Sequence, residues 1–274
     1  MIRIETRGVF VFATLDAPAT RNALSDTMVA GLVDAIAKAE GLADCRALVI
    51  RGAGGTFCAG GDFGRFRELM ATPAPADGPD PIAGFNRGFG AMLERLHACA
   101  VPTIAVVEGA AMGGGCGLAA ACDFVLAASS AQFGMPEVTL GLPPAQIAPF
   151  VAARLGSGHA LRLMLTGRRL GAAQALDVGL ADIVAEPAEL DAQLHALLAD
   201  LGRAEPAALR ATKAIVQRRQ HAVLADTLDF AAAQFAASLR SGTAAEGIAA
   251  LMAKRPARWV VRERDATVPA EPAA

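Results

Sequence analysis

Short apolar runs alternate with longer amphipathic segments over most of the chain. Runs rich in β-branched residues predict buried strands over residues 2–6, 9–15, 47–51, 103–107, 124–127 and 181–184. Apolar positions three and four residues apart predict helices over residues 25–40, with Ser25 as N-cap, and over 84–97, 144–155, 158–165 and 172–178. This alternation is typical of an α/β protein, in which helices cover a sheet.

From residue 189 onward the pattern is helical only. It predicts helices over residues 189–201, 206–220, 224–241 and 244–254, and we place a boundary near residue 200, between a core of residues 1–200 and a helical region of residues 201–274. The segment 224–241 carries an apolar stripe that is either internal core or a contact between subunits. Residues 70–81 are rich in proline and predict no regular element, and residues 262–274 are expected to fray.

Composition narrows the class of protein. The 274 residues are 54% hydrophobic, which suffices for one large domain with an appendage. With 25 basic and 27 acidic residues the net charge is −2, so nothing indicates a nucleic-acid partner. The chain begins with strand-like alternation, so we expect no signal peptide, and no apolar stretch argues for a membrane partner.

Cysteine and histidine usage gives two further expectations. The five cysteines are odd in number and lack CxxC spacing, which indicates reduced core thiols and favours a cytoplasmic location. The four histidines form no cluster with ligand spacing, so we expect no metal.

Two glycine-rich turns carry the strongest functional signal. The strand at 103–107 is followed by three consecutive glycines, 113–115, and then by a predicted helix, whose start presents unpaired backbone N–H groups. A second strand leads into the turn 53–62, where Asp62 can cap the next helix. Neither turn matches a phosphate loop or a dinucleotide fingerprint. Two convergent N–H donors are instead what an oxyanion hole requires.

These turns belong to an ordered set of motifs. The set contains Phe57-Cys-Ala-Gly-Gly-Asp62, Gly113-Gly-Gly-Cys-x-Leu-Ala-x-x-Cys-Asp123 and Gln132-Phe-Gly-Met-Pro-Glu137, with further matches at 18–24, 165–182 and 246–256. Together they resemble the enoyl-CoA hydratase/isomerase (crotonase) superfamily over most of the chain.

The resemblance implies an α/β fold with a ββα-spiral core and a C-terminal helical trimerisation region that covers the CoA site. It implies a homotrimer, or a hexamer made of two trimers, and an acyl-CoA thioester as substrate. Coenzyme A is then part of the substrate, and no separate cofactor is expected. By the same resemblance, residues 70–81 are either a mobile loop over the acyl pocket or a surface insertion.

The resemblance also assigns the reacting groups. It places the oxyanion-hole N–H groups on Ala59 and Gly114 and the acid–base role on Glu137. Hydratases of the superfamily usually carry a second glutamate, but the matching position, twenty residues before Glu137, is Gly117. Apolar neighbours raise the pKa of a carboxyl group, which suits proton transfer by Glu137 near neutral pH. We expect Gly117 to open space beside the β-carbon of the substrate.

Further substrate contacts follow from position within the motifs. They are Arg21, Ala23, Cys58, Gly60, Asp62, Phe63, Gly113, Gly117, Pro136, Leu140, Ala145, Gln146 and Lys254. Gln146 either contacts water or a distal acyl group, or it faces solvent at a helix start. Lys254 is placed to meet an adenosine phosphate of a neighbouring site.

A single carboxylate supports two reactions. It can activate water against the β-carbon of a 2-enoyl-CoA, which is hydration, or move a proton from C2 to C4, which is Δ3,Δ2-enoyl-CoA isomerisation. Residues 137–151 resemble hydratases of branched glutaconyl-CoA esters, such as isohexenylglutaconyl-CoA hydratases. We expect a hydratase first and an isomerase second. Decarboxylase, hydrolase and dehalogenase variants stay open, as does a non-catalytic acyl-CoA binder.

Overall fold

A six-stranded sheet forms the centre of the molecule. The computed structural model describes residues 1–71, 77–78, 80–218 and 243–260. The sheet has the order β1-β2-β3-β4-β6-β9, made of β1 (Ile2–Arg7), β2 (Phe10–Leu15), β3 (Ala47–Gly52), β4 (Thr103–Val107), β6 (Phe124–Ala128) and β9 (Ile183–Ala185). Only β1 and β2 pair antiparallel, so the loops that follow β2, β3, β4 and β6 leave the sheet at one common edge.

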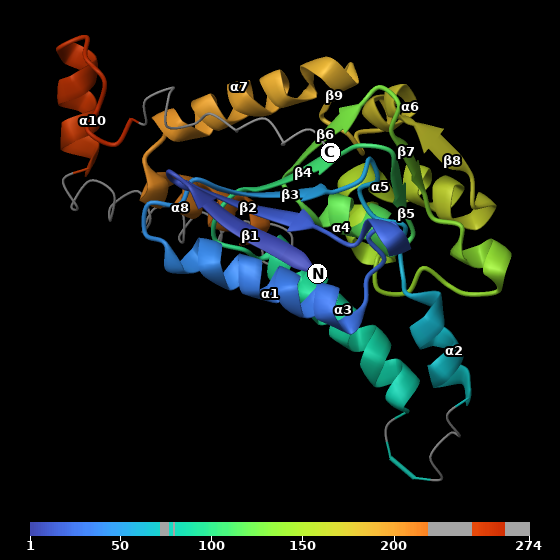
Figure 1. The fold of residues 1–274 in the computed structure, drawn as a ribbon. Coiled ribbons are helices and arrows are strands. Elements are labelled where there is room, and N and C mark those ends of the chain that lie inside the picture. The colour runs from blue at the N-terminus through green and yellow to red at the C-terminus, as the bar shows by residue number, and fades with distance from the viewer. Residues whose placement is uncertain (72–76, 79, 219–242, 261–274) are drawn as a thin grey trace.

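Helices cover both faces of this sheet (Figure 1). Helices α1 (Asp26–Gly41) and α3 (Pro81–His97) lie on one face, and α7 (Leu190–Arg203) lies on the other. The cause is the alternation of side chains along each strand. In β2, Val11 packs in the core beneath α1 and α3, whereas Phe10 packs in the core beneath α7.

A second sheet, which the sequence patterns did not predict, lies beside the first (Figure 1). It consists of β5 (Ala110–Met112), β7 (Gln132–Gly134) and β8 (Arg169–Gly171). Strand β5 pairs parallel with β7, and β7 pairs antiparallel with β8. Strands of three residues are too short to show a period of two, so the sequence carries no signal for them.

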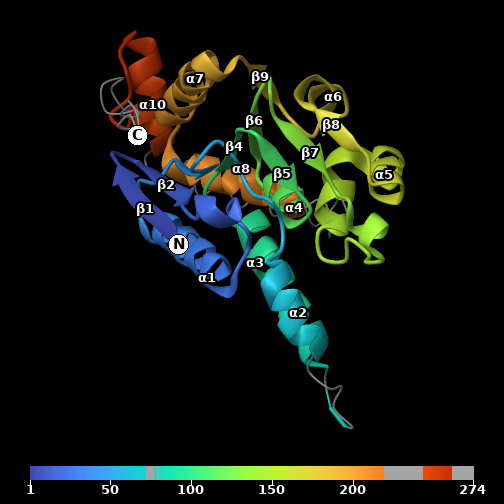
Figure 2. The ribbon, with the colours of Figure 1, turned by 45° about the vertical axis from the view of Figure 1, so that its right-hand side comes forward.

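Further helices complete the described structure. They are α2 (Phe63–Ala71), α4 (Gly114–Ala121), α5 (Ala148–Thr166), α6 (Ala172–Asp177), α8 (Pro206–Arg218) and α10 (Thr243–Met252), with short 3-10 helices η1 (Pro18–Thr20), η2 (Glu137–Leu140) and η3 (Pro187–Glu189). Helix α2 and the start of α3 project from the body, and α10 lies at the opposite end of the molecule (Figure 2).

Most predicted elements are confirmed, but several boundaries differ. The two helices predicted at 144–155 and 158–165 form the single helix α5, which bends at Gly156 (φ 73°, ψ 156°). Residues 144–147 precede α5 rather than opening it. The strand predicted at 181–184 is shifted to β9.

The predicted break at 70–81 is also shorter than expected. Helix α2 runs to Ala71, and α3 already begins at Pro81. The Asp80 side chain accepts a hydrogen bond from the Ile82 N–H at 2.7 Å, and proline suits the first turn of a helix. Residues 72–76 and 79 lie outside the described part of the chain.

All five cysteines are buried and free, as predicted. Burial raises the pKa of the Cys58, Cys116 and Cys122 thiols to about 12. They are therefore protonated core residues rather than nucleophiles.

The C-terminal region is described only in part. Helix α8 is tied to the core, because the Lys213 ammonium group contacts Asp123 at 2.6 Å. The predicted helix 224–241 and the tail 262–274 lie outside the described residues, so the boundary near residue 200 and the trimer stay predictions. Within the described ranges, no helix is both long and apolar enough to cross a membrane.

Candidate active site

Three loops meet where β5 joins its neighbours. Cys58 forms a parallel bridge with Ala111 of β5, so the turn that follows Cys58 lies beside the end of β5. Strands β5 and β7 are parallel, and the Gly113 N–H donates to the Gly134 carbonyl at 2.8 Å. The turns after Cys58, after β5 and after β7 therefore emerge side by side. They bring together the two glycine-rich turns and Glu137, as the motifs suggested.

A buried asparagine holds the first of these turns in place. Asn22 is fully buried, and its amide nitrogen donates to the carbonyl groups of Ala53 at 2.9 Å and Thr56 at 2.7 Å. Its amide oxygen accepts the Ala17 N–H at 2.9 Å. Arg21 and Asn22 both have left-handed backbone conformations, which asparagine tolerates well. No sequence signal pointed to this role of Asn22, which lies within the matched segment 18–24.

The prediction for Ala59 is corrected by the structure. The Ala59 N–H donates to the Arg21 carbonyl at 2.9 Å, so it is not a free donor. Gly61, two residues later, forms a parallel β-bridge with Leu24, in which the Leu24 N–H donates to the Gly60 carbonyl at 2.8 Å. In a parallel bridge the flanking residues make the bonds, so the Gly61 N–H points away from Leu24. Within the described residues, the Gly61 N–H has no hydrogen-bond acceptor.

The second turn supplies another free N–H group. Gly114 is the first residue of α4, where N–H groups have no partner within the helix, and none is found elsewhere in the described residues. The two turns are in contact, because a Cβ at Gly60 would lie 3.6 Å from the Gly114 nitrogen and 2.8 Å from the Met112 oxygen. Only glycine fits at residue 60 under these conditions, since its φ is also +99°.

Apolar side chains, two of which lie outside the motifs, enclose this meeting point. A Cβ at Gly114 would lie 2.8 Å from Leu24 and 3.3 Å from Phe89 of α3. A Cβ at Gly61 would lie 2.5 Å from the ring of Phe66 of α2. Leu24 and the two phenylalanines thus surround the free N–H groups with apolar surface. A lone aromatic in a helical pattern is usually core, so the sequence alone did not mark them.

Glu137 lies against the start of α4. It is the first residue of η2, and its Oε1 would be 2.8 Å from a Cβ at Gly113. Its other oxygen, Oε2, is buried and has no hydrogen-bond partner among the described residues. Loss of hydration raises the pKa of the Glu137 carboxyl group above its ordinary value. A desolvated carboxyl with a free oxygen is suited to exchanging a proton with a bound molecule.

The expectation that Gly117 opens space is wrong. A Cβ at Gly117 would lie 2.1 Å from Cγ2 and 2.5 Å from Cβ of Ile147, which is only 3% exposed. The space beside Gly117 is therefore filled by a side chain that precedes α5. Nothing in the sequence motif indicated this contact, because the two residues are thirty positions apart.

Gln146 does not face solvent at a helix start, which was one of its two expected positions. It precedes α5, and its side chain packs against Gly90 of α3, where a Cβ would lie 1.8 Å from its Oε1. Its Nε2 donates to the Asn86 side-chain oxygen at 3.0 Å. The side chain is half-buried between α3 and the segment that follows Glu137.

The other predicted contacts fall into three groups. Cys58 is fully buried and cannot offer its thiol to a ligand, and Asp62 caps α2 by accepting the Gly64 N–H at 2.8 Å. Three are exposed or half-exposed near the loops described above, namely Arg21, Ala23 and Pro136, and Leu140 and Ala145 are exposed in the segment after Glu137. Lys254 is exposed beyond α10, and Phe63 begins α2, with its side chain outside the described part of the structure.

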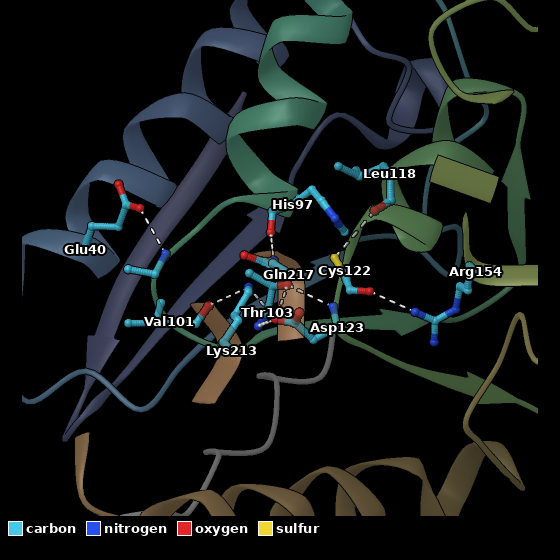
Figure 3. Close-up of polar contacts among 11 residues, drawn as sticks. Glu40, His97, Val101, Thr103, Leu118, Cys122, Asp123, Arg154, Lys213 and Gln217 are labelled. Carbon is cyan, nitrogen blue, oxygen red and sulfur yellow. Dashed lines mark hydrogen bonds and ion pairs between the residues drawn. The ribbon is translucent and has the colours of Figure 1, made fainter. Parts of the chain in front are cut away.

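Two other acids near the motifs have structural roles. Asp123 Oδ2 accepts hydrogen bonds from the Thr103 N–H at 2.7 Å, the Thr103 hydroxyl at 2.9 Å and Lys213 at 2.6 Å (Figure 3). Glu108 forms an ion pair with Arg51 at 2.9 Å. Both carboxylates are occupied by partners, which leaves Glu137 as the carboxylate at the meeting point of the loops.

A cavity of about 300 Å³ lies elsewhere, between α5, β8 and α6. His159, Arg162, Arg168 and Arg169 are among its lining residues, whereas Glu137 and the free N–H groups are not. The reacting groups described above therefore lie outside this cavity, in the region of Glu137.

Comparison with known proteins establishes the family of this chain. The family model described as enoyl-CoA hydratase/isomerase matches residues 5–262. The chain belongs to the enoyl-CoA hydratase/isomerase family. A probable enoyl-CoA hydratase from Rhizobium meliloti is 34% identical over 264 residues, which cover 93% of this chain and 96% of that protein.

Solved structures of the enoyl-CoA hydratase/isomerase family confirm the crotonase fold. An enoyl-CoA hydratase/isomerase from Marinobacter aquaeolei is 41% identical, with a TM-score of 0.91 and coverage of 95% of this chain and 99% of that one. Pseudomonas aeruginosa AtuE is 39% identical, with a TM-score of 0.90 and the same coverage. The mixed α/β fold with its central sheet is thus the fold of this family.

Proposed function

We propose that this family member is an enoyl-CoA hydratase, which adds water to the double bond of a 2-enoyl-CoA thioester. The observation that carries the proposal is the position of Glu137, whose desolvated carboxyl lies against Gly113 with one oxygen unpartnered. Relatives named as enoyl-CoA hydratases support the choice of reaction.

The proposed reaction assigns a role to each group. The Glu137 carboxylate accepts a proton from water as the water oxygen bonds to C3 of the substrate. The electrons of the double bond move toward the thioester, whose oxygen gains negative charge and accepts hydrogen bonds from the N–H groups of Gly61 and Gly114. One such donor typically stabilises the transition state by about 3 kcal/mol. The proton then returns to C2, which completes the addition.

A second function is favoured by the lack of a second carboxylate at residue 117. Glu137 alone can remove a proton from C2 of a 3-enoyl-CoA and return it at C4, which is Δ3,Δ2-isomerisation. The same two N–H groups would stabilise the enolate in either reaction. Non-catalytic acyl-CoA binding is the third possibility, and it requires no proton transfer at all.

The test compares Glu137→Gln with the natural chain on crotonyl-CoA and on a 3-enoyl-CoA. The substitution keeps the shape of the side chain and removes its acid–base function, so kcat should fall at least about 100-fold with little change in KM. Glu189→Gln is the matched control, because Glu189 is exposed at the end of η3 and lies outside the matched motifs.

The outcomes separate the candidates. Turnover of crotonyl-CoA that depends on Glu137 supports the hydratase, and turnover of the 3-enoyl-CoA alone supports the isomerase. Binding of both esters without turnover identifies a binder. A Glu137→Gln variant that keeps most of its kcat contradicts the assignment of Glu137.

A further inference from the structure

Two consecutive side chains, Gln146 and Ile147, each occupy the space above a buried glycine of a different helix. Gln146 fills the space above Gly90 of α3, and Ile147 fills the space above Gly117 of α4. A Cβ at Gly90 would lie 1.8 Å from Oε1 of Gln146, and a Cβ at Gly117 would lie 2.1 Å from Cγ2 of Ile147. Both distances are far below van der Waals contact. The segment before α5 is therefore fitted closely between α3 and α4. A side chain at Gly117 would meet the Cβ of Ile147, close to the backbone, whereas one at Gly90 would have to displace the end of the flexible Gln146 side chain.

This segment is continuous with the turn that carries Glu137. The Leu142 N–H donates to the Glu137 carbonyl at 3.0 Å, and the Ala148 N–H donates to the Pro144 carbonyl at 2.9 Å. Two successive prolines, 143 and 144, restrict the backbone between these bonds. The position of Ile147 is thus coupled to the position of Glu137 through a short and restrained stretch of chain.

Glu137 and Ile147 approach α4 on successive turns. Gly113 and Gly117 are four residues apart, and the Gly117 N–H donates to the Gly113 carbonyl at 3.0 Å. Glu137 lies against the first of these glycines and Ile147 against the second. Phe89, which contacts the space above Gly114, comes from the helix that Gln146 touches. Phe89 therefore lies beside the Gly114 N–H group, and Ile147 lies one helical turn from the glycine that Glu137 contacts.

We propose that Ile147 is a specificity-determining residue, which stands where a side chain at residue 117 would stand and limits the room beside the reacting carbon. The proposal rests on the proposed function, since it concerns the acyl group next to Glu137. It follows that the site holds one carboxylate because packing excludes a second. It also follows that acyl groups with a substituent on C3 are disfavoured by Ile147.

The first experiment tests the packing and needs no activity. It measures Tm for Gly117→Ala, Ile147→Ala and the double variant. Gly117→Ala should lower Tm strongly, and Ile147→Ala should lower it by loss of a buried side chain. The decrease in Tm of the double variant should be smaller than the sum of the two single decreases, because the methyl group added at residue 117 enters the space that the Ile147 side chain has left. Additive effects would overturn the proposal.

The second experiment tests specificity. It compares crotonyl-CoA with 3-methylcrotonyl-CoA, as kcat/KM and as Kd. Ile147→Ala should change the ratio of kcat/KM for the two esters by about 10-fold or more in favour of 3-methylcrotonyl-CoA. One methyl group more or less in an apolar pocket has an effect of this size. Ile104→Ala is the control, because Ile104 is fully buried on the face of the sheet covered by α7.

The control should lose stability and keep the natural ratio of the two esters. An unchanged ratio in Ile147→Ala would overturn the proposal. If neither ester is turned over by the natural chain, the proposed function fails, and the Kd ratio and the Tm coupling still decide whether Ile147 limits the site.

Discussion

Gly113 connects the backbone of the site to its carboxylate, and its replacement by alanine gives a sharp test. The residue has φ 52° and ψ −120°, a conformation that essentially only glycine adopts. Alanine in such a conformation costs about 1–3 kcal/mol. For a chain of this size, each kcal/mol lowers Tm by about 2–4 °C.

The added methyl group has a second effect that is specific to the site. Its Cβ would lie 2.8 Å from Oε1 of Glu137, so the carboxylate must retreat by more than about half an ångström to reach ordinary contact distance. A displacement of about 1 Å at a reacting group can reduce the rate by about 100-fold, so a retreat of half that size should reduce it by about 10-fold. We therefore expect Gly113→Ala to lose both stability and kcat.

Gly156→Ala separates the two effects. Gly156 also has a conformation reserved for glycine, with φ 73° and ψ 156°, but a Cβ there meets no atom within 4 Å. It should lower Tm by a similar amount and keep kcat. Steady-state hydration of crotonyl-CoA and thermal unfolding measure both quantities. If Gly113→Ala keeps the kcat of Gly156→Ala, then Glu137 does not react from the position seen here.

Two further predictions concern charge. Desolvation raises the pKa of Glu137, so the folded chain holds this proton more tightly than the unfolded chain, and stability falls as the pH rises from the ordinary value of 4.5 through the raised pKa. Glu137→Gln should therefore gain Tm relative to the natural chain across that window and not below it; a difference in Tm that is independent of pH would contradict this. Lys213→Met removes the partner of Asp123 and should lower the free energy of unfolding in urea by about 3 kcal/mol, whereas the exposed Lys38→Met should change it little. Equal effects of the two lysine substitutions would show that the contact between Lys213 and Asp123 contributes no stability.

The sequence determined the elements whose signals are local. The main strands and the helices α1, α6 and α7 follow from apolar periodicity, and Ser25 caps α1 as predicted, accepting the Met28 N–H at 3.3 Å. The glycine-rich turns and Glu137 were recognisable because each occupies a short, contiguous motif. The family assignment depended on these motifs and was confirmed.

Only the tertiary structure decided which groups are available for chemistry. Whether a backbone N–H is free depends on a partner distant in sequence. The motif therefore could not show that the Ala59 N–H donates to the Arg21 carbonyl, or that the Gly61 N–H has no acceptor among the described residues. The room beside a glycine depends on what packs above it, and Ile147, thirty residues away, fills the space at Gly117. Local patterns reflect the preferences of one segment, whereas donors, cavities and desolvation are properties of several segments in contact.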